Sequence, residues 1–128
     1  MAEQTRDLLA LVASGDHAGL EAALQAGADP NSADRWGVTA LAQASARGDL
    51  AAVQTLLAQG AAPDRPSDAG NRPLMAAAAR GHIEVMKALL DAGAKPSDGN
   101  KWGFGPKDWA TWPANRADVL ALLESREN

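Results

Sequence analysis

Apolar and small residues recur along this chain at one fixed spacing. Three rows of such residues advance by 33 positions at each step: Leu24, Leu57, Leu90 and Leu123; Leu20, Val53, Met86 and Val119; and Ala44, Ala77 and Ala110. Because the three rows share one period, the pattern predicts a repeat protein in which equivalent residues occupy equivalent places in successive units.

Glycines divide each period into two short helices. Gly15, Gly48 and Gly81 follow the first apolar stretch of successive units, and Gly27, Gly60 and Gly93 follow the second. A glycine just past a helix accepts the left-handed conformation that ends it. We therefore expect helices at about 5–13 and 17–25, and further pairs displaced from these by multiples of 33 residues.

The segment after each second helix cannot continue as a helix. Pro30, Pro63 and Pro96 stand three residues after the glycine that ends that helix, and proline has no backbone N–H for the helical ladder. An extended, hairpin-like loop should follow and close at Gly37, Gly70 and Gly103. Pro73 and Pro106 come next and suit the first turn of the following helix.

This combination of period, helix pair and loop resembles the ankyrin repeat. Gly37-Val38-Thr39-Ala40-Leu41-Ala42-Gln43-Ala44 is similar to the family's G-x-T-P-L-H-x-A motif, and Gly27-Ala28-Asp29-Pro30-Asn31 is similar to its G-A-D-P-N ending. The resemblance implies an all-α solenoid of four stacked helix-turn-helix units with hairpin-like loops. It implies a single domain over 1–128, with repeats at approximately 1–33, 34–66, 67–99 and 100–128.

The sequence departs from the family pattern in two ways. Ala42 and Met75 replace the histidine of T-P-L-H, so hydrogen bonds that often tie neighbouring repeats should be missing. The first and last units should act as caps, since a terminal repeat lacks one neighbour. In the interior we expect the space between layers to be filled by leucines, namely Leu24, Leu56, Leu57, Leu89 and Leu90.

Composition narrows the possible functions. The chain has 128 residues, 46% of them hydrophobic, and a net charge of -4; an acidic molecule repels phosphate backbones, which disfavours nucleic-acid binding. With no cysteine, disulfides and thiolate zinc sites are excluded. We expect no signal peptide, because the apolar stretch near the N-terminus is too short for one, and no apolar run reaches membrane-spanning length. We expect a monomeric, cytoplasmic protein that contacts no membrane.

The residues suited to chemistry are few. His17 and His82 both fall at the turn into a second helix, where a capping or packing role is favoured over a catalytic or metal-binding one. Asp16 and Asp49 recur at the same turn and are expected to cap helices rather than to act as an acid and base pair. No phosphate-loop, zinc or hydrolase motif is present. We expect no enzyme activity, no cofactor and no metal.

The resemblance also implies where a partner would bind, because ankyrin proteins commonly use the residues flanking the loop glycine and the end of the first helix. In this chain those positions are Arg35, Trp36, Val38, Ala46, Arg47, Asp68, Ala69, Asn71, Ala79, Arg80, Lys101, Trp102, Phe104 and Trp112. Four of them are basic and one is acidic, which favours a protein partner with an acidic surface patch.

Tryptophans strengthen this expectation, since tryptophan and arginine are enriched at binding hot spots. Trp36 and Trp102 fall at matching loop tips, where there is little core to fill. Trp109 is expected to close the end of the core, and Trp112 fits either role. The sequence therefore predicts a protein-binding module, and the resemblance implies that the partner binds to the concave face and the loop tips. An inhibitor or immunity protein that neutralises a cognate enzyme or toxin is the alternative, and nucleic-acid binding is a weaker one.

Overall fold

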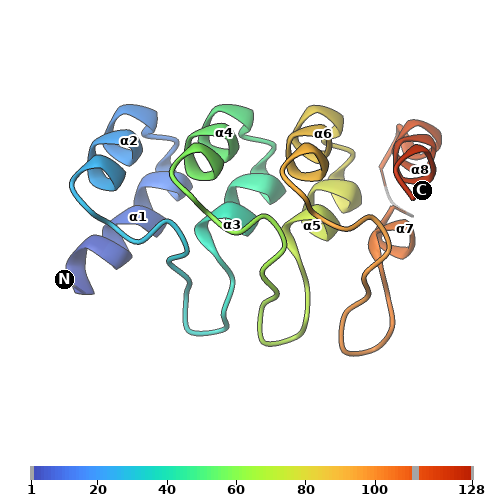
Figure 1. Cartoon of the computed structure of the whole chain (residues 1–128), viewed down its shortest axis with the longest axis horizontal. Coiled ribbons are helices and arrows are strands. Elements are labelled where there is room, and N and C mark those ends of the chain that lie inside the picture. Colours follow the sequence, from blue (N-terminus) through green and yellow to red (C-terminus); the bar gives the residue numbers. More distant parts are fainter. Residues whose placement is uncertain (1, 111–112, 128) are drawn as a thin grey trace.

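The computed structural model describes residues 2–110 and 113–127, with side chains from Leu8 onward. This part of the chain forms eight helices: α1 (Ala2–Ser14), α2 (His17–Gln25), α3 (Ala40–Arg47), α4 (Leu50–Ala58), α5 (Pro73–Arg80), α6 (Ile83–Asp91), α7 (Pro106–Trp109) and α8 (Arg116–Ser125). They form four antiparallel pairs in two rows, with α1, α3, α5 and α7 in one and α2, α4, α6 and α8 in the other (Figure 1). The predicted all-α solenoid is confirmed.

The helix boundaries follow from local chemistry. The predicted range of the second helices is reproduced by α2, α4 and α6. Between the helices of a pair, Gly48 and Gly81 adopt φ of 72° and 71°, a left-handed conformation in which a side chain would be strained. The first helix α3 begins two residues later than predicted because Thr39 caps it, with its Oγ1 accepting from Ala42 N at 3.0 Å.

The terminal first helices differ from the prediction in length. Helix α1 is longer than the predicted 5–13, because residues 2–14 contain neither glycine nor proline. Helix α7 covers only Pro106–Trp109, whereas the period predicts 104–112. Pro106 starts it at the first turn, as expected for a residue without a backbone N–H.

The core is continuous through the stack. Ala44, Ala77 and Ala110 are each 0% exposed, and each first helix contacts the next one along the stack. The expectation that both leucines fill the core is correct for Leu56, which is 0% exposed, but only partly correct for Leu57, which is partly buried. On α4, Leu56 lies on the buried face with Ala52 and Val53, and Leu57 is one residue further round the helix, at the edge of that face.

Polar side chains at the base of the loops join successive repeats. Asn31 Oδ1 accepts from Ala62 N at 2.8 Å. Asp64 stands 33 residues after Asn31, and hydrogen bonding by the Lys95 backbone lowers its pKa. Arg72 flanks Asp64: its Nη1 donates to the Asp64 carbonyl at 2.8 Å and lies 3.6 Å from Oδ2.

The carboxyl of Asp64 is less stable as an anion than in water. Burial raises the pKa of Asp64 above its usual 3.8, Arg72 lowers it, and the negative charge of Asp98 raises it further. The net pKa is raised because desolvation outweighs the attraction to Arg72. Asp64 Oδ1 is also buried without a hydrogen-bond partner among the described residues.

Leu56→Ala should lower the free energy of unfolding by about 2–5 kcal/mol, because it leaves a cavity at a fully buried position. Leu57→Ala should cost clearly less, and exposed Gln54→Ala under about 0.5 kcal/mol. Urea unfolding followed by circular dichroism measures all three. Equal losses for Leu56→Ala and Leu57→Ala would contradict the burial described here.

Asp64→Asn should raise the melting temperature at neutral pH while keeping the Lys95 contact, which Asn31 shows an asparagine can make. When folding raises the pKa of an acidic group, the folded protein loses stability as the pH rises above the pKa of that group in the unfolded chain, here about 3.8. The two proteins should therefore melt alike below that pH, and the advantage of the variant should grow above it. Calorimetric scans at several pH values test this, and an advantage independent of pH argues against it.

Candidate binding surface

Side-chain acceptors shape the tips of the first and third hairpin loops, residues 33–39 and 99–105. Asp34 Oδ1 accepts from Trp36 N at 2.9 Å and Val38 N at 3.0 Å. Asn100 Oδ1 accepts from the equivalent residues, Trp102 N at 2.9 Å and Phe104 N at 3.1 Å. A short polar side chain used in this way stabilises a tight turn. The backbone of both tips is thereby fixed.

Large apolar side chains project from these fixed tips. Trp36 is 58% exposed, Trp102 67% and Phe104 53%, and they are the exposed large hydrophobic residues of the described chain. The Arg35 guanidinium lies 4.5 Å from the centre of the Trp36 ring, a cation–π arrangement. The prediction of tryptophans at matching, exposed loop tips is confirmed for both residues.

Neighbouring hairpins are joined edge to edge by their backbones. Asp68 N donates to Trp36 O at 2.9 Å, and Lys101 N donates to Ala69 O at 3.2 Å. These bonds require glycine beside them, since a Cβ on Gly70, at φ +83°, would lie 2.9 Å from Lys101 N. The three tips therefore form one continuous edge.

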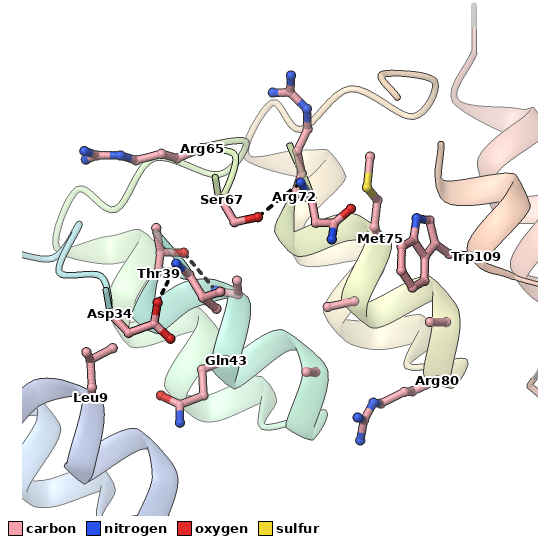
Figure 2. Close-up of a pocket in the computed structure, with 16 residues that line it drawn as sticks. Leu9, Asp34, Thr39, Gln43, Arg65, Ser67, Arg72, Met75, Arg80 and Trp109 are labelled. Carbon is pink, nitrogen blue, oxygen red and sulfur yellow. Dashed lines mark hydrogen bonds between the residues drawn. The ribbon is translucent and has the colours of Figure 1, made fainter. Parts of the chain in front are cut away.

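A groove of about 500 Å³ runs between α3 and α5, beside the hairpin loops (Figure 2). Alanines, Val38 and Met75 give it an apolar floor, and Arg65 and Arg80 extend from different sides of it. The full lining is Leu9, Asp34, Val38, Thr39, Ala42, Gln43, Ala46, Arg65, Ser67, Asn71, Arg72, Met75, Ala76, Ala79, Arg80 and Trp109.

The residues predicted to bind a partner fall into two places. Val38, Ala46, Asn71, Ala79 and Arg80 line the groove. The hairpin edge carries Arg35, Trp36, Asp68, Ala69, Lys101, Trp102 and Phe104.

Arg47 and Trp112 belong to neither of these two sets. Arg47 is exposed in the last turn of α3, as Arg80 is in the last turn of α5; a cation there is favoured by the helix dipole. Arg47 is not among the residues that line the groove. Trp112 lies outside the described residues.

Sequence reasoning missed part of the groove. Gln43, Arg65 and Arg72 were not expected at a binding surface, and Trp109 was expected to close the core. Trp109 is half-buried, lines the groove, and has a buried Nε1 with no hydrogen-bond partner among the described residues. The period contained a usable signal, since Gln43, Ala76 and Trp109 are 33 residues apart and occupy one row.

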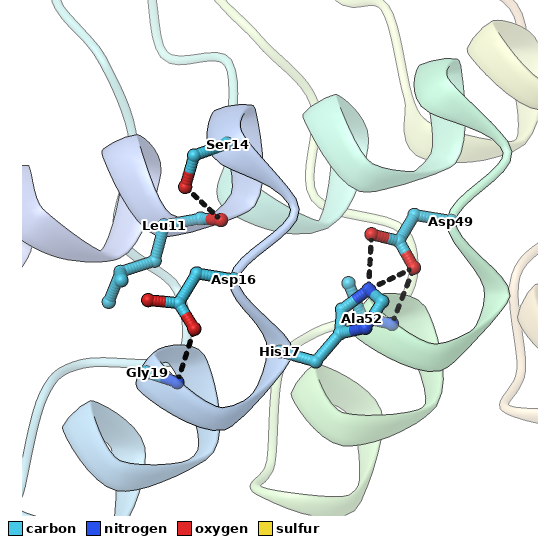
Figure 3. A network of polar contacts seen from close by, with 7 residues as sticks. All are labelled: Leu11, Ser14, Asp16, His17, Gly19, Asp49 and Ala52. Carbon is cyan, nitrogen blue, oxygen red and sulfur yellow. Dashed lines mark hydrogen bonds and ion pairs between the residues drawn. The ribbon is translucent and has the colours of Figure 1, made fainter.

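Both histidines connect repeats, and Figure 3 shows the contact of His17 with Asp49. His17 Nε2 lies 2.8 Å from both carboxylate oxygens of Asp49. Asp49 also accepts from Ala52 N at 3.1 Å at the start of α4, so its expected capping role is confirmed. Asp16 caps α2 in the same way, accepting from Gly19 N at 2.9 Å.

His82 differs from the aspartates at its position. Its side chain makes no capping bond to α6. Instead, its Nε2 lies 3.2 Å from Ala46 O, and its ring packs over Gly48. Asn115, 33 residues later, donates to Gly81 O at 2.9 Å. His82 therefore has a packing role between the second and third helix pairs.

The described residues contain no group of three or more histidine or carboxylate side chains placed to hold a metal ion. None of their helices combines the length and apolarity that crossing a bilayer requires.

Comparison with known proteins identifies the family of the chain. Residues 8–100 match the family description "Ankyrin repeats (3 copies)", and the structure places a fourth helix pair, α7 and α8, after the end of this span. No curated protein sequence matched the chain. Since the match covers most of the sequence and agrees with the helix pairs and hairpins described above, the chain belongs to the ankyrin-repeat family, whose members generally serve as protein–protein interaction modules.

Proposed function

We propose that this protein binds another protein through its hairpin edge and the ends of its first helices. The observation that carries the proposal is the exposure of Trp36 and Trp102, at 58% and 67%, on equivalent tips. Indoles held in water by a rigid backbone are typical of a surface that is covered on binding. Ala69 occupies the same position on the tip between them, so the edge has two large anchors with a small residue in the middle.

The charges around these anchors favour an acidic partner. Arg35 and Lys101 are exposed beside the two tryptophans, and Arg47 and Arg80 are exposed at the ends of α3 and α5. Asp68 is the acidic residue in this set. The net charge of -4 belongs to the whole molecule and works against a nucleic-acid ligand, which would require broad positive potential.

A narrower form of the proposal is that the protein inhibits its partner, as an immunity protein neutralises an enzyme or toxin. Its support is the pre-organised edge, in which backbone bonds between tips hold the anchors in place before binding. The proposal includes a monomer acting in the cytoplasm. An activity assay of the captured partner, with and without this protein, separates inhibition from simple tethering.

Trp36→Ala and Trp102→Ala should each weaken partner binding by about 2 kcal/mol or more, as truncated hot spots do. Both side chains lie largely in water, so melting temperatures should hardly change. The partner is recovered by affinity capture with the full chain and titrated by calorimetry against each variant. Wild-type affinity in both variants would refute the hairpin edge as the interface.

The double variant Arg47→Glu/Arg80→Glu should slow association and flatten its dependence on salt, because it reverses two charges at equivalent places in adjacent repeats. Stopped-flow association at several ionic strengths measures the effect. Lys87→Glu on α6 is the control, since Lys87 is exposed on a second helix near Glu84. A loss of binding confined to Lys87→Glu would place the interface on the opposite side of the stack.

A further inference from the structure

The floor of the groove has a regular pattern of side-chain size. Gln43, Ala76 and Trp109 occupy equivalent positions on α3, α5 and α7, and all three line the groove. The methyl group of Ala76 therefore lies between two larger side chains. The groove is also lined by other small side chains, those of Ala42, Ala46 and Ala79. The groove between α3 and α5 thus has an alanine floor, with Gln43 at one side and Trp109 at the other (Figure 2).

Those two side chains have unused hydrogen-bonding capacity. Gln43 Oε1 and Trp109 Nε1 are buried and have no partner among the described residues. A buried amide oxygen without a hydrogen bond destabilises the folded protein. Gln43 lines the groove, and the terminal torsion of glutamine is soft, so its amide can turn towards a hydrogen-bond donor placed there.

The charge of the groove is positive. Three arginines line it, Arg65, Arg72 and Arg80, against one acidic residue, Asp34. Asp34 Oδ1 already accepts from Trp36 N and Val38 N, and Arg72 is paired with Asp64. Arg65 and Arg80 are exposed and have no ion pair within the described part of the chain. Two cations are therefore available, one towards each side of the apolar floor.

We infer that the groove binds an extended, acidic peptide segment of the partner protein, with small side chains over Ala76. The Gln43 amide offers an acceptor and a donor, which match the N–H and C=O of one peptide unit. A helical segment would present few such groups, because its backbone is hydrogen-bonded within itself. Carboxylates on either side of this unit pair with Arg65 and Arg80.

This inference rests on the proposed function and adds a second contact, distinct from the hairpin edge. It is tested with a phage-displayed library of random linear ten-residue peptides, selected on the full chain. The most enriched sequence is then synthesised with blocked termini and titrated by fluorescence polarisation. Enrichment of Asp or Glu together with Gly, Ala or Ser is expected. Enrichment of basic or strongly helical sequences, or no enrichment at all, overturns the inference.

Gln43→Leu gives a readout that a merely structural role would not produce. Removal of a buried, unpaired oxygen should raise the melting temperature, whereas loss of the peptide hydrogen bond should weaken the peptide about tenfold. Gln54→Leu on the exposed face of α4 is the matched control and should not change peptide affinity. Unchanged affinity in Gln43→Leu overturns the role of the amide.

Ala76→Met provides an independent test, since it fills the hollow without altering Gln43. The peptide should then bind at least about tenfold more weakly, provided that melting shows a folded protein. Arg65→Gln and Arg80→Gln should each weaken binding and reduce its salt dependence. If the peptide binds Ala76→Met as well as wild type, the groove is not its site.

The hairpin edge serves to separate the two proposals. Trp36→Ala and Trp102→Ala should leave peptide affinity unchanged, because neither tryptophan lines the groove. If no peptide binds but the captured partner depends on both tryptophans, the groove inference fails and the proposed function stands. If the peptide binds only while Trp36 is present, the peptide occupies the hairpin edge, and the groove inference fails.

Discussion

The close approach of the first helices is the constraint on which the other features of this protein depend. It is favoured by small residues at equivalent positions of successive repeats, since Ala44, Ala77 and Ala110 are fully buried and a larger side chain at any of them would disturb the packing. That spacing allows the backbone bond from Asp68 N to Trp36 O and its counterpart from Lys101 N to Ala69 O. The hairpin edge is therefore as regular as the core beneath it.

On this regular backbone, the shape of the surface is set by side-chain size alone. The tip row contains Trp36, Ala69 and Trp102, and the groove row contains Gln43, Ala76 and Trp109. In both rows the third repeat carries alanine between larger neighbours. Met75, where the family motif has histidine, adds to the apolar floor of the groove. The binding surface of this ankyrin protein is thus shaped by a few side chains whose size does not alter the stacking of the repeats.

Much of the fold could be predicted from the sequence, because glycine and proline act locally. The bounds of α2, α4 and α6 follow from glycines on both sides, whereas the start of α3 depends on the Thr39 cap, which the period does not reveal. The period also does not say that Leu56 rather than Leu57 is fully buried. The exposed tryptophans were predictable, and so were five of the residues that line the groove, Val38, Ala46, Asn71, Ala79 and Arg80. The shape of the groove was not, because it depends on the relative sizes of side chains from different repeats.

The hairpin edge and the groove would contribute to binding through different interactions, the first through burial of apolar surface and the second through attraction between charges. Covering Trp36 and Trp102 removes apolar surface from water, which depends little on ionic strength. Contacts with Arg65 and Arg80 depend on charge and weaken as salt rises. Because each repeat contacts only its neighbours, the unpaired Gln43 Oε1 and Trp109 Nε1 atoms should lower the stability mainly of the repeats on either side of α5. A ligand that satisfies them would stabilise those layers, so binding and local stability are coupled in the middle of the stack.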